Sequence, residues 1–160
     1  MKHLFNNIIV AVSGTSSSIL AAKYAIVLAK YYHCKLTVIY VVDMATIKQL
    51  TLSKIFVQEE AAEYEGSLEA NGNRYLTFVE ELAHAKGVKI EKVMRRGAVY
   101  TEILKVADEH KADLILLGGI EHDTSSRDII GHYHREIMAN SKCSVLLVKE
   151  PNIDQIYKKL

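Results

Sequence analysis

Glycines and a histidine that follow a buried strand are the residues of this chain best placed to do chemistry. Gly118 and Gly119 come directly after the apolar run Leu114–Leu117, and Gly131 and His132 lie further along. In an open parallel sheet, glycines just past a strand's carboxyl end usually lie against a nucleotide's phosphates, near the N-terminus of the next helix. The sequence therefore predicts a nucleotide site at the end of this strand.

The elements that must position this site alternate along the chain. Five short apolar runs predict strands: Ile8–Val12, Leu36–Val42, Ile90–Met94, Leu114–Leu117 and Val145–Val148. Their continuous hydrophobicity is typical of parallel strands covered on both faces, and segments with helical spacing separate them. The alternation predicts a doubly wound α/β fold. We expect residues 1–160 to form a single domain, because this length suits one sizeable core.

Composition and charge argue against several partners. The chain has 20 basic and 19 acidic residues, so no overall field favours nucleic acid or an anionic membrane. No apolar run approaches the ~20 residues of a membrane span, and Met1–Asn7 does not resemble a signal peptide. We therefore expect a cytoplasmic protein, in which Cys34 and Cys143 are reduced structural thiols.

Four segments, taken in order, resemble the universal stress protein family over nearly the whole chain. They are Asn7–Thr15, Leu36–Asp43, Ala112–Gly118 and Cys143–Lys149. The resemblance implies a five-stranded parallel sheet of order 3-2-1-4-5 with helices on both faces. The turns Ser13–Ser18 and Gly118–Asp123 would then face each other across a crevice, at the switch point where such sheets bind ligands. The resemblance also implies a homodimer formed around the edge strand Ser144–Val148.

ATP-binding members of that family carry Gly-x2-Gly-x9-Gly-Ser/Thr after the fourth strand, and this chain keeps only part of the motif. Gly118 matches the first glycine and Gly131 the third, but Glu121 and His132 stand at the second glycine and at the hydroxyl position. At the first turn, Ser13 replaces the family's usual Asp. Glu121 adds bulk and negative charge where a phosphate would lie. The resemblance is therefore to a degenerate ATP-binding motif.

The expected ligand is an adenine nucleotide, ATP or AMP, with Mg²⁺ only if ATP is bound. We expect the adenine side to lie against Ala11, Ser13 and Val41. The residues expected near the phosphates are Gly118, Gly119, Arg127, Gly131, His132 and Tyr133. Arg127 offers a guanidinium suited to bidentate contact with a phosphate. No dedicated catalytic residue is expected, and the implied role is a stress-response or signalling module with an unidentified signalling partner.

A protein-interaction module that binds no nucleotide is the first alternative. In that case Gly118 and Gly119 would serve only a tight turn. The segment Met44–Gly72 is longer than a plain crossover, and Gly66 and Gly72 are expected to break helices within it. We expect a mobile excursion followed by a long helix. Its apolar residues would form a lid, a partner surface or a cover for the sheet edge: Ile47, Leu50, Ile55 and Phe56.

An ATP-using enzyme of the PP-loop type is the second alternative. Ser13, Gly14 and Ser18 match the Ser-Gly-Gly-x-Asp-Ser loop of those enzymes. Thr15 and Ser17 stand at that loop's second glycine and aspartate, so the expected acidic partner for magnesium is missing.

Three histidines close together in sequence raise the question of a metal site. His132 and His134 would point roughly 200° apart on a helix, because each residue turns ~100°. His122 lies in the preceding loop and could approach only one of them. We therefore expect no metal centre here.

Overall fold

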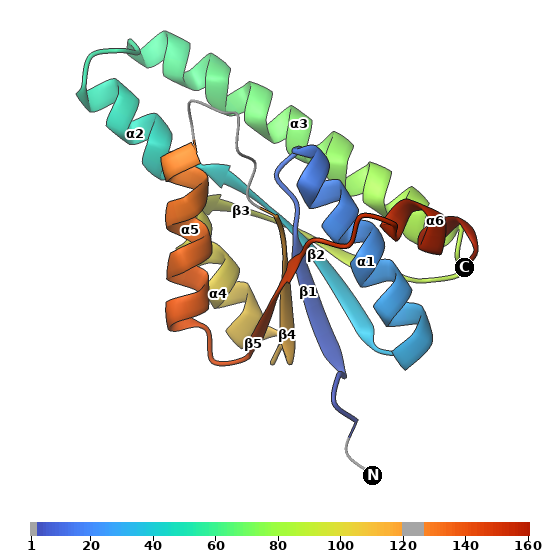
Figure 1. Cartoon of the computed structure of the whole chain (residues 1–160). Helices are drawn as coiled ribbons and strands as arrows, with labels where there is room; N and C mark the ends of the chain where they lie inside the picture. Colours follow the sequence, from blue (N-terminus) through green and yellow to red (C-terminus); the bar gives the residue numbers. More distant parts are fainter. Residues whose placement is uncertain (1–2, 120–126) are drawn as a thin grey trace.

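The computed structural model describes residues 3–119 and 127–160, with the side chains of residues 127–132 outside that description. The elements follow one another in chain order (Figure 1): β1 Asn7–Ala11, α1 Ser16–Tyr32, β2 Lys35–Asp43, α2 Met44–Leu52, α3 Gln58–His84, β3 Ile90–Gly97, α4 Val99–Glu109, β4 Leu114–Gly118, α5 Arg127–Asn140, β5 Ser144–Val148 and α6 Ile153–Lys158. All strands pair in parallel in the order β3-β2-β1-β4-β5. The predicted doubly wound sheet and its strand order are confirmed.

Two helical layers cover the sheet, as predicted. α1, α3 and α6 pack on one face and α4 and α5 on the other (Figure 1). Successive strand residues point to opposite faces. Val10 and its partner Val38 therefore pack towards α1 and α3, whereas Ile9 and its partner Ile115 pack towards α4 and α5. Among the described residues, no helix is both long and apolar enough to cross a membrane.

The two edge strands are less covered than the sequence suggested. β3 extends past the predicted end at Met94 to Gly97, and none of its residues is buried. In β5 only Val148 is buried. The prediction that every strand is covered on both faces is therefore wrong at the edges. An edge strand has a neighbour on one side only and lies at the margin of the helical layers.

The segment Met44–Gly72 forms α2 and the first half of α3. Gly66 and Gly72 do not break a helix, because α3 runs continuously through both. Gly72 is buried where α3 crosses β2, and a Cβ there would lie 2.6 Å from Cε1 of Tyr40. Tertiary packing thus outweighs the low helix propensity of glycine. Motion of this segment stays a prediction.

The residues after Pro151 form the helix α6. Ile153 and Tyr157 are buried in the core cluster that α1 and α3 share. The Tyr157 hydroxyl donates to the Leu82 carbonyl oxygen at 2.7 Å. Outside the core, Lys23 pairs with Asp154 at 2.5 Å. The sequence gives little sign of this helix, because only two of its residues are buried, Ile153 and Tyr157.

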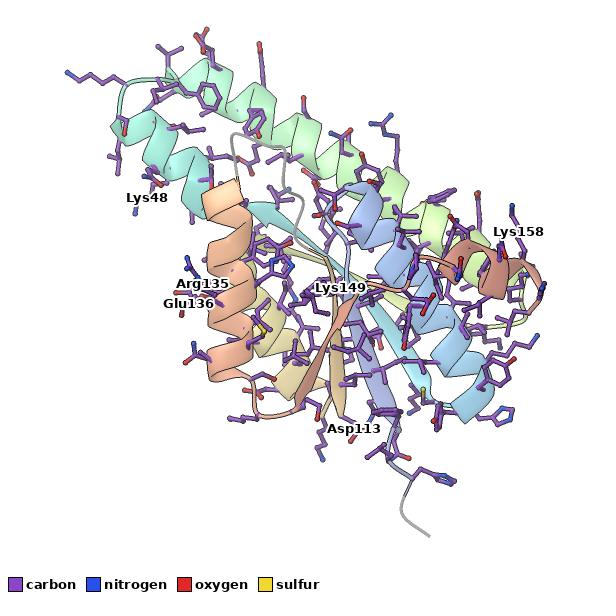
Figure 2. All side chains as sticks on the ribbon, viewed as in Figure 1. Lys48, Asp113, Arg135, Glu136, Lys149 and Lys158 are labelled. Carbon is purple, nitrogen blue, oxygen red and sulfur yellow. The ribbon has the colours of Figure 1, made fainter. Side chains whose placement is uncertain are left out.

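Structural contacts tie the amino ends of β1 and β4 together. The Asp113 carboxylate accepts hydrogen bonds from the backbone N–H groups of Asn6 and Asn7 at 2.6 and 2.8 Å, and it lies at the end of the sheet away from α2 (Figure 2). Cys34 and Cys143 are free and half-buried next to this end, and burial raises the pKa of the Cys34 thiol.

Candidate ligand-binding site

A cavity of about 320 Å³ lies at the carboxyl ends of β1 and β2. Strand ends form its floor, and α2, α3, α4 and α5 each contribute to its walls. Its lining is mostly apolar, with hydroxyl groups and one carboxylate: Ala11, Val12, Ser13, Thr15, Ile39, Tyr40, Val41, Asp43, Thr46, Tyr64, Leu68, Val99, Ile103 and Tyr133. A pocket of this size and character suits a small ligand with a flat apolar part and a few polar groups.

The turn between β1 and α1 presents hydroxyl groups to the cavity. The Ser13 N–H donates to Ser18 Oγ at 3.1 Å, and that hydroxyl donates to the Thr15 carbonyl oxygen at 2.8 Å. Thr15 is the N-cap of α1, because its Oγ1 accepts from the Ser18 N–H at 3.2 Å. The side chains of Ser13 and Thr15 are hydrogen-bonded to each other at 3.2 Å. The turn is therefore held in one shape before any ligand arrives.

Gly14 makes this turn possible. Its φ is +85°, a conformation that residues with a Cβ rarely adopt. A Cβ at this position would also lie 2.6 Å from Cζ of Tyr75 on α3. The turn is thus fitted against α3, and the match to a PP-loop glycine has a structural reason that needs no nucleotide.

Tyr133 joins α5 to the same turn. Its side chain is hydrogen-bonded to that of Ser13, and burial raises the pKa of the Tyr133 phenol although the Ser13 contact opposes the rise. The next residue, His134, is buried, and its Nε2 donates to the Gly118 carbonyl oxygen at 2.7 Å. Arg135 points away from the sheet (Figure 2). α5 therefore turns Tyr133 and His134 inward, and Tyr133 keeps a neutral phenol at the cavity wall.

Asp43 brings a carboxylate to the cavity. It is the last residue of β2 and the N-cap of α2, accepting from the N–H of Thr46 at 3.0 Å and from its hydroxyl at 2.7 Å. Each carboxylate oxygen keeps further acceptor capacity. An acid at this place can accept hydrogen bonds from neighbouring hydroxyl groups of a sugar. Position 13 lacks the acid that the family carries at the first turn, and Asp43 supplies one to the same cavity.

Gly118 and Gly119 border a separate, much smaller crevice of about 10 Å³. Gly118 lies against the first turn of α1, where a Cβ would be 2.7 Å from the carbonyl oxygen of Ser17. A Cβ on Gly119 would lie 3.2 Å from the Val148 carbonyl oxygen. Close packing of β4 against α1 is thus one reason for glycine at position 118. The phosphate contact expected at these glycines stays a prediction.

The structure brings part of the predicted site together. Ala11, Ser13, Val41 and Tyr133 all line the cavity. Arg127, Gly131 and His132 belong to the part of α5 whose side chains are not described, so their predicted contacts stay predictions. Glu121, His122 and Asp123 lie outside the described residues. In the described parts of the chain, no three metal-ligating side chains come together.

Sequence reasoning missed most of the lining. The unpredicted residues are Val12, Thr15, Ile39, Tyr40, Asp43, Thr46, Tyr64, Leu68, Val99 and Ile103. Asp43 could have been found, because an acid directly after a buried strand lies at the carboxyl edge of the sheet. Tyr64 and Leu68 could not, because the expected helix break at Gly66 concealed that α3 continues past the strand ends.

Comparisons with known proteins agree with this architecture. Residues 4–149 match the model of the universal stress protein family. The chain is 32% identical over 150 residues to universal stress protein MJ0531 of Methanocaldococcus jannaschii, covering 94% of this chain and 85% of that protein.

Solved structures share the fold. UspA from Lactobacillus plantarum superposes with a TM-score of 0.76 at 19% identity, covering 92% of this chain and all of that one (100%). A universal stress protein solved in complex with cAMP superposes with a TM-score of 0.66 at 23% identity, covering 92% of this chain and 99% of the other. On the family match over nearly its whole length, this chain belongs to the universal stress protein family.

Proposed function

We propose that this universal stress protein binds an adenine nucleotide, AMP or ATP, in the cavity at the ends of β1 and β2. The observation that carries the proposal is the convergence of Ala11, Ser13, Val41 and Tyr133 on one cavity that also contains Asp43. The apolar floor suits a purine, and the hydroxyl and carboxylate groups suit a ribose. The structural relative in complex with cAMP supports the choice of an adenine ligand.

The proposed pose places the base over Ala11 and Val41 and the ribose between Ser13 and Asp43. Asp43 then accepts hydrogen bonds from the ribose hydroxyl groups. In relatives with an acid at position 13, that acid would be the acceptor. The phosphates extend towards the Gly118–Gly119 turn and the start of α5, where Arg127 and His132 are the proposed contacts. Mg²⁺ is required only when ATP is the ligand. Glu121 lowers the affinity for a highly charged ligand by repulsion.

The protein acts by binding and carries no dedicated chemistry in this proposal. Ligand-dependent contact with a signalling partner in the cytoplasm is the proposed output, and the two free cysteines suit a reducing compartment. Slow hydrolysis of ATP is the competing outcome. Magnesium-dependent release of phosphate at a constant rate, abolished by the same variants that abolish binding, would favour the enzyme.

A homodimer is proposed through β5. This strand lies at the edge of the sheet, pairs with β4 alone among the described strands, and leaves Val145, Leu146 and Leu147 half-buried. Pairing with a second copy would cover both the apolar side chains and the open backbone edge. Sedimentation velocity at micromolar concentration tests this: Leu147→Asp is expected to give a monomer, and a monomeric unsubstituted protein would contradict the proposal.

Isothermal titration of nucleotide-free protein tests the binding proposal. Adenosine, AMP, cAMP and ATP are titrated with and without Mg²⁺, and we expect a Kd of about 100 μM or tighter, roughly −5.5 kcal/mol. Val41→Phe fills the cavity and should abolish the heat. Val93→Phe makes the same change on the neighbouring strand, outside the cavity lining, and should leave binding intact. No heat at millimolar ligand would leave the protein-interaction module as the function.

A further inference from the structure

The first half of α3 extends beyond the carboxyl ends of the strands (Figure 1). In the second half of the helix, Gly72, Leu76, Val79 and Ala83 are buried. None of residues 58–71, all of which the structure describes, is buried, and we call this segment the overhang of α3. Most helical stability in proteins comes from packing of an apolar face. The overhang has no buried residue, so it depends on other contacts to stay in place.

The overhang forms one wall of the cavity at the ends of β1 and β2. Tyr64 and Leu68 are its two residues in the cavity lining. The ring centroid of Tyr64 lies 5.4 Å from that of Phe56, which belongs to the connection between α2 and α3. Even so, 40% of Tyr64 is exposed. The shape of the cavity therefore depends on where the overhang is held.

A row of side chains on β3 contacts α3. Lys92, Met94 and Arg96 alternate along the strand and so point to the face that α3 covers. Lys92 pairs with Glu80 at 2.9 Å, and the Met94 methyl group would lie 2.8 Å from a Cβ on Gly72. Arg96 is the last contact of this row, at the carboxyl end of the strand. The row thus continues from the buried half of α3 onto the overhang.

Arg96 bridges two carboxylates of the overhang. Its Nη1 donates to Glu65 and its Nη2 donates to Glu69. The two carboxylates are four residues apart on α3, where like charges repel and weaken a helix. Among the described residues, both salt bridges of the overhang go to Arg96. One exposed ion pair contributes little, but a guanidinium shared by two carboxylates is a small network that offsets their repulsion.

The residues that Arg96 holds are the direct neighbours of the cavity wall. Glu65 follows Tyr64 and Glu69 follows Leu68, so one turn of backbone carries both sets of side chains. Each residue of a helix turns by ~100°. A contact that fixes the rotation of α3 at the two carboxylates therefore also fixes the direction of the two cavity residues. Arg96 is not part of the cavity lining, so it acts on the cavity through the helix.

We propose that Arg96 is a positioning residue of the ligand site, which holds the overhang of α3 against the cavity through Glu65 and Glu69. The inference rests on the proposed function and adds the group that maintains the binding-competent shape. When this contact opens, the overhang can move away and a smaller fraction of the molecules can bind. The apparent Kd rises as that fraction falls. A ligand that contacts Tyr64 and Leu68 stabilises the closed overhang in return.

Hydrogen exchange of the empty protein, followed by mass spectrometry, is the first test. With Arg96→Gln, the amides of residues 58–71 should exchange about fivefold faster, whereas those of residues 76–83 should keep their rate. Arg95→Gln is the matched control, because Arg95 is the neighbouring residue on β3 and pairs with Glu109 of α4 at 2.5 Å. Equal exchange of residues 58–71 in Arg96→Gln and the unsubstituted protein would overturn the inference.

Adenosine binding is the second test, because this ligand carries no charge that Arg96 could attract directly. Isothermal titration should give a Kd about fivefold higher for Arg96→Gln and an unchanged Kd for Arg95→Gln. Raising NaCl from about 50 mM to about 500 mM screens exposed ion pairs. The salt should weaken adenosine binding to the unsubstituted protein by about threefold and leave Arg96→Gln unaffected. The same salt dependence in both proteins would contradict the proposed role of the ion pairs.

Reversal of the charges is the third test and examines the contact itself. Arg96→Glu brings three carboxylates together and should weaken adenosine binding by about tenfold. Adding Glu65→Arg and Glu69→Arg to that variant restores the attraction with opposite signs. Exchange of residues 58–71 and adenosine affinity should then return to within about twofold of the unsubstituted protein. A triple variant that binds as weakly as Arg96→Glu would overturn the inference.

The hydrogen-exchange test separates the inference from the proposed function, since it uses no ligand. If the unsubstituted protein binds adenosine but Arg96→Gln changes neither the exchange of residues 58–71 nor the Kd, the inference alone is overturned. If the unsubstituted protein does not bind adenosine at all, the proposed function is overturned, and the positioning role falls with it.

Discussion

Gly118 at the end of β4 lies directly against the backbone of Ser17 in the first turn of α1. A Cβ on Gly118 would be 2.7 Å from the Ser17 carbonyl oxygen and 2.8 Å from the Ser18 nitrogen. Both neighbours are backbone atoms, which cannot move aside as the end of a side chain can. The glycine that marks the start of the family's nucleotide motif thus also sets the distance between a central strand and the helix that covers it.

Gly118→Ala is therefore expected to destabilise the fold by about 1–3 kcal/mol, the usual cost of forcing an extra methyl group into close packing. Urea unfolding followed by circular dichroism measures this change. Gly119→Ala is the neighbouring comparison, where the nearest atom is the Val148 carbonyl oxygen at 3.2 Å, and it should cost less. A Gly118→Ala protein as stable as the unsubstituted one would show that β4 and α1 can separate without penalty.

Two glycines in α3 should respond to alanine with opposite signs. A methyl group added at Gly66 would meet no atom within 4 Å among the described residues outside its own helix backbone, whereas at Gly72 the Tyr40 ring and the Met94 methyl group lie within 2.8 Å of it. Gly66→Ala should stabilise the protein by about 0.5–1 kcal/mol through helix propensity alone. Gly72→Ala should cost about 1–3 kcal/mol through overpacking, less the same gain. Urea unfolding of both variants measures the two changes in the free energy of unfolding. If both variants were stabilised, the Tyr40 ring and the Met94 methyl group would not restrict the space at Gly72.

The fold could be predicted from the sequence because its signals are local and redundant. Buried runs such as Leu36–Val42 specify strands, and the alternation with helices fixes the class. Gly72 shows where such reasoning fails. Its residue type indicates a helix break, but the glycine has a packing reason, because the ring of Tyr40, a residue distant in sequence, leaves no room for a Cβ there. α6 was missed for a related reason, since only contact with α1 and α3 makes Ile153 and Tyr157 core residues.

The candidate site could be predicted only where it follows strand ends. Ala11 and Val41 were found because parallel strands finish at one edge of the sheet, and the same logic would have given Asp43. Tyr64 and Leu68 come from a helix whose path the sequence did not reveal. Gly118 illustrates a third case. It was predicted as a phosphate contact, but its close packing against the backbone of Ser17 already requires a glycine there.

Asp43→Asn tests the ribose contact. Asn is also a good N-cap, so α2 should keep its cap, while the charged acceptor is lost. Hydrogen bonds to charged groups contribute about 1.5–3 kcal/mol, so adenosine should bind at least tenfold more weakly. Titration with 2′,3′-dideoxyadenosine supplies the control, because a ligand without those hydroxyl groups should bind both proteins equally. An equal loss for both ligands would mean that Asp43 acts through the shape of the cavity.

The partly buried phenol of Tyr133 should make the fold sensitive to alkaline pH. Burial raises its pKa above the ordinary value of 10.0, because the folded protein favours the neutral form. The folded state then holds its proton at a pH where the unfolded chain releases it. This contribution to stability is complete below about pH 10 and is lost as the pH rises through the folded pKa.

Tyr133→Phe removes that titration, so its free energy of unfolding should fall less steeply above about pH 10 than that of the unsubstituted protein. Urea unfolding at a series of pH values measures the two slopes. Tyr31→Phe removes a phenol that is 69% exposed and is the matched control, expected to keep the original slope. If Tyr133→Phe loses stability as steeply as the unsubstituted protein, the phenol must ionise as readily in the folded state as in the unfolded chain. The Tyr133 phenol would then be more exposed to solvent than its contact with Ser13 indicates, and the cavity wall beside α5 would be open to water.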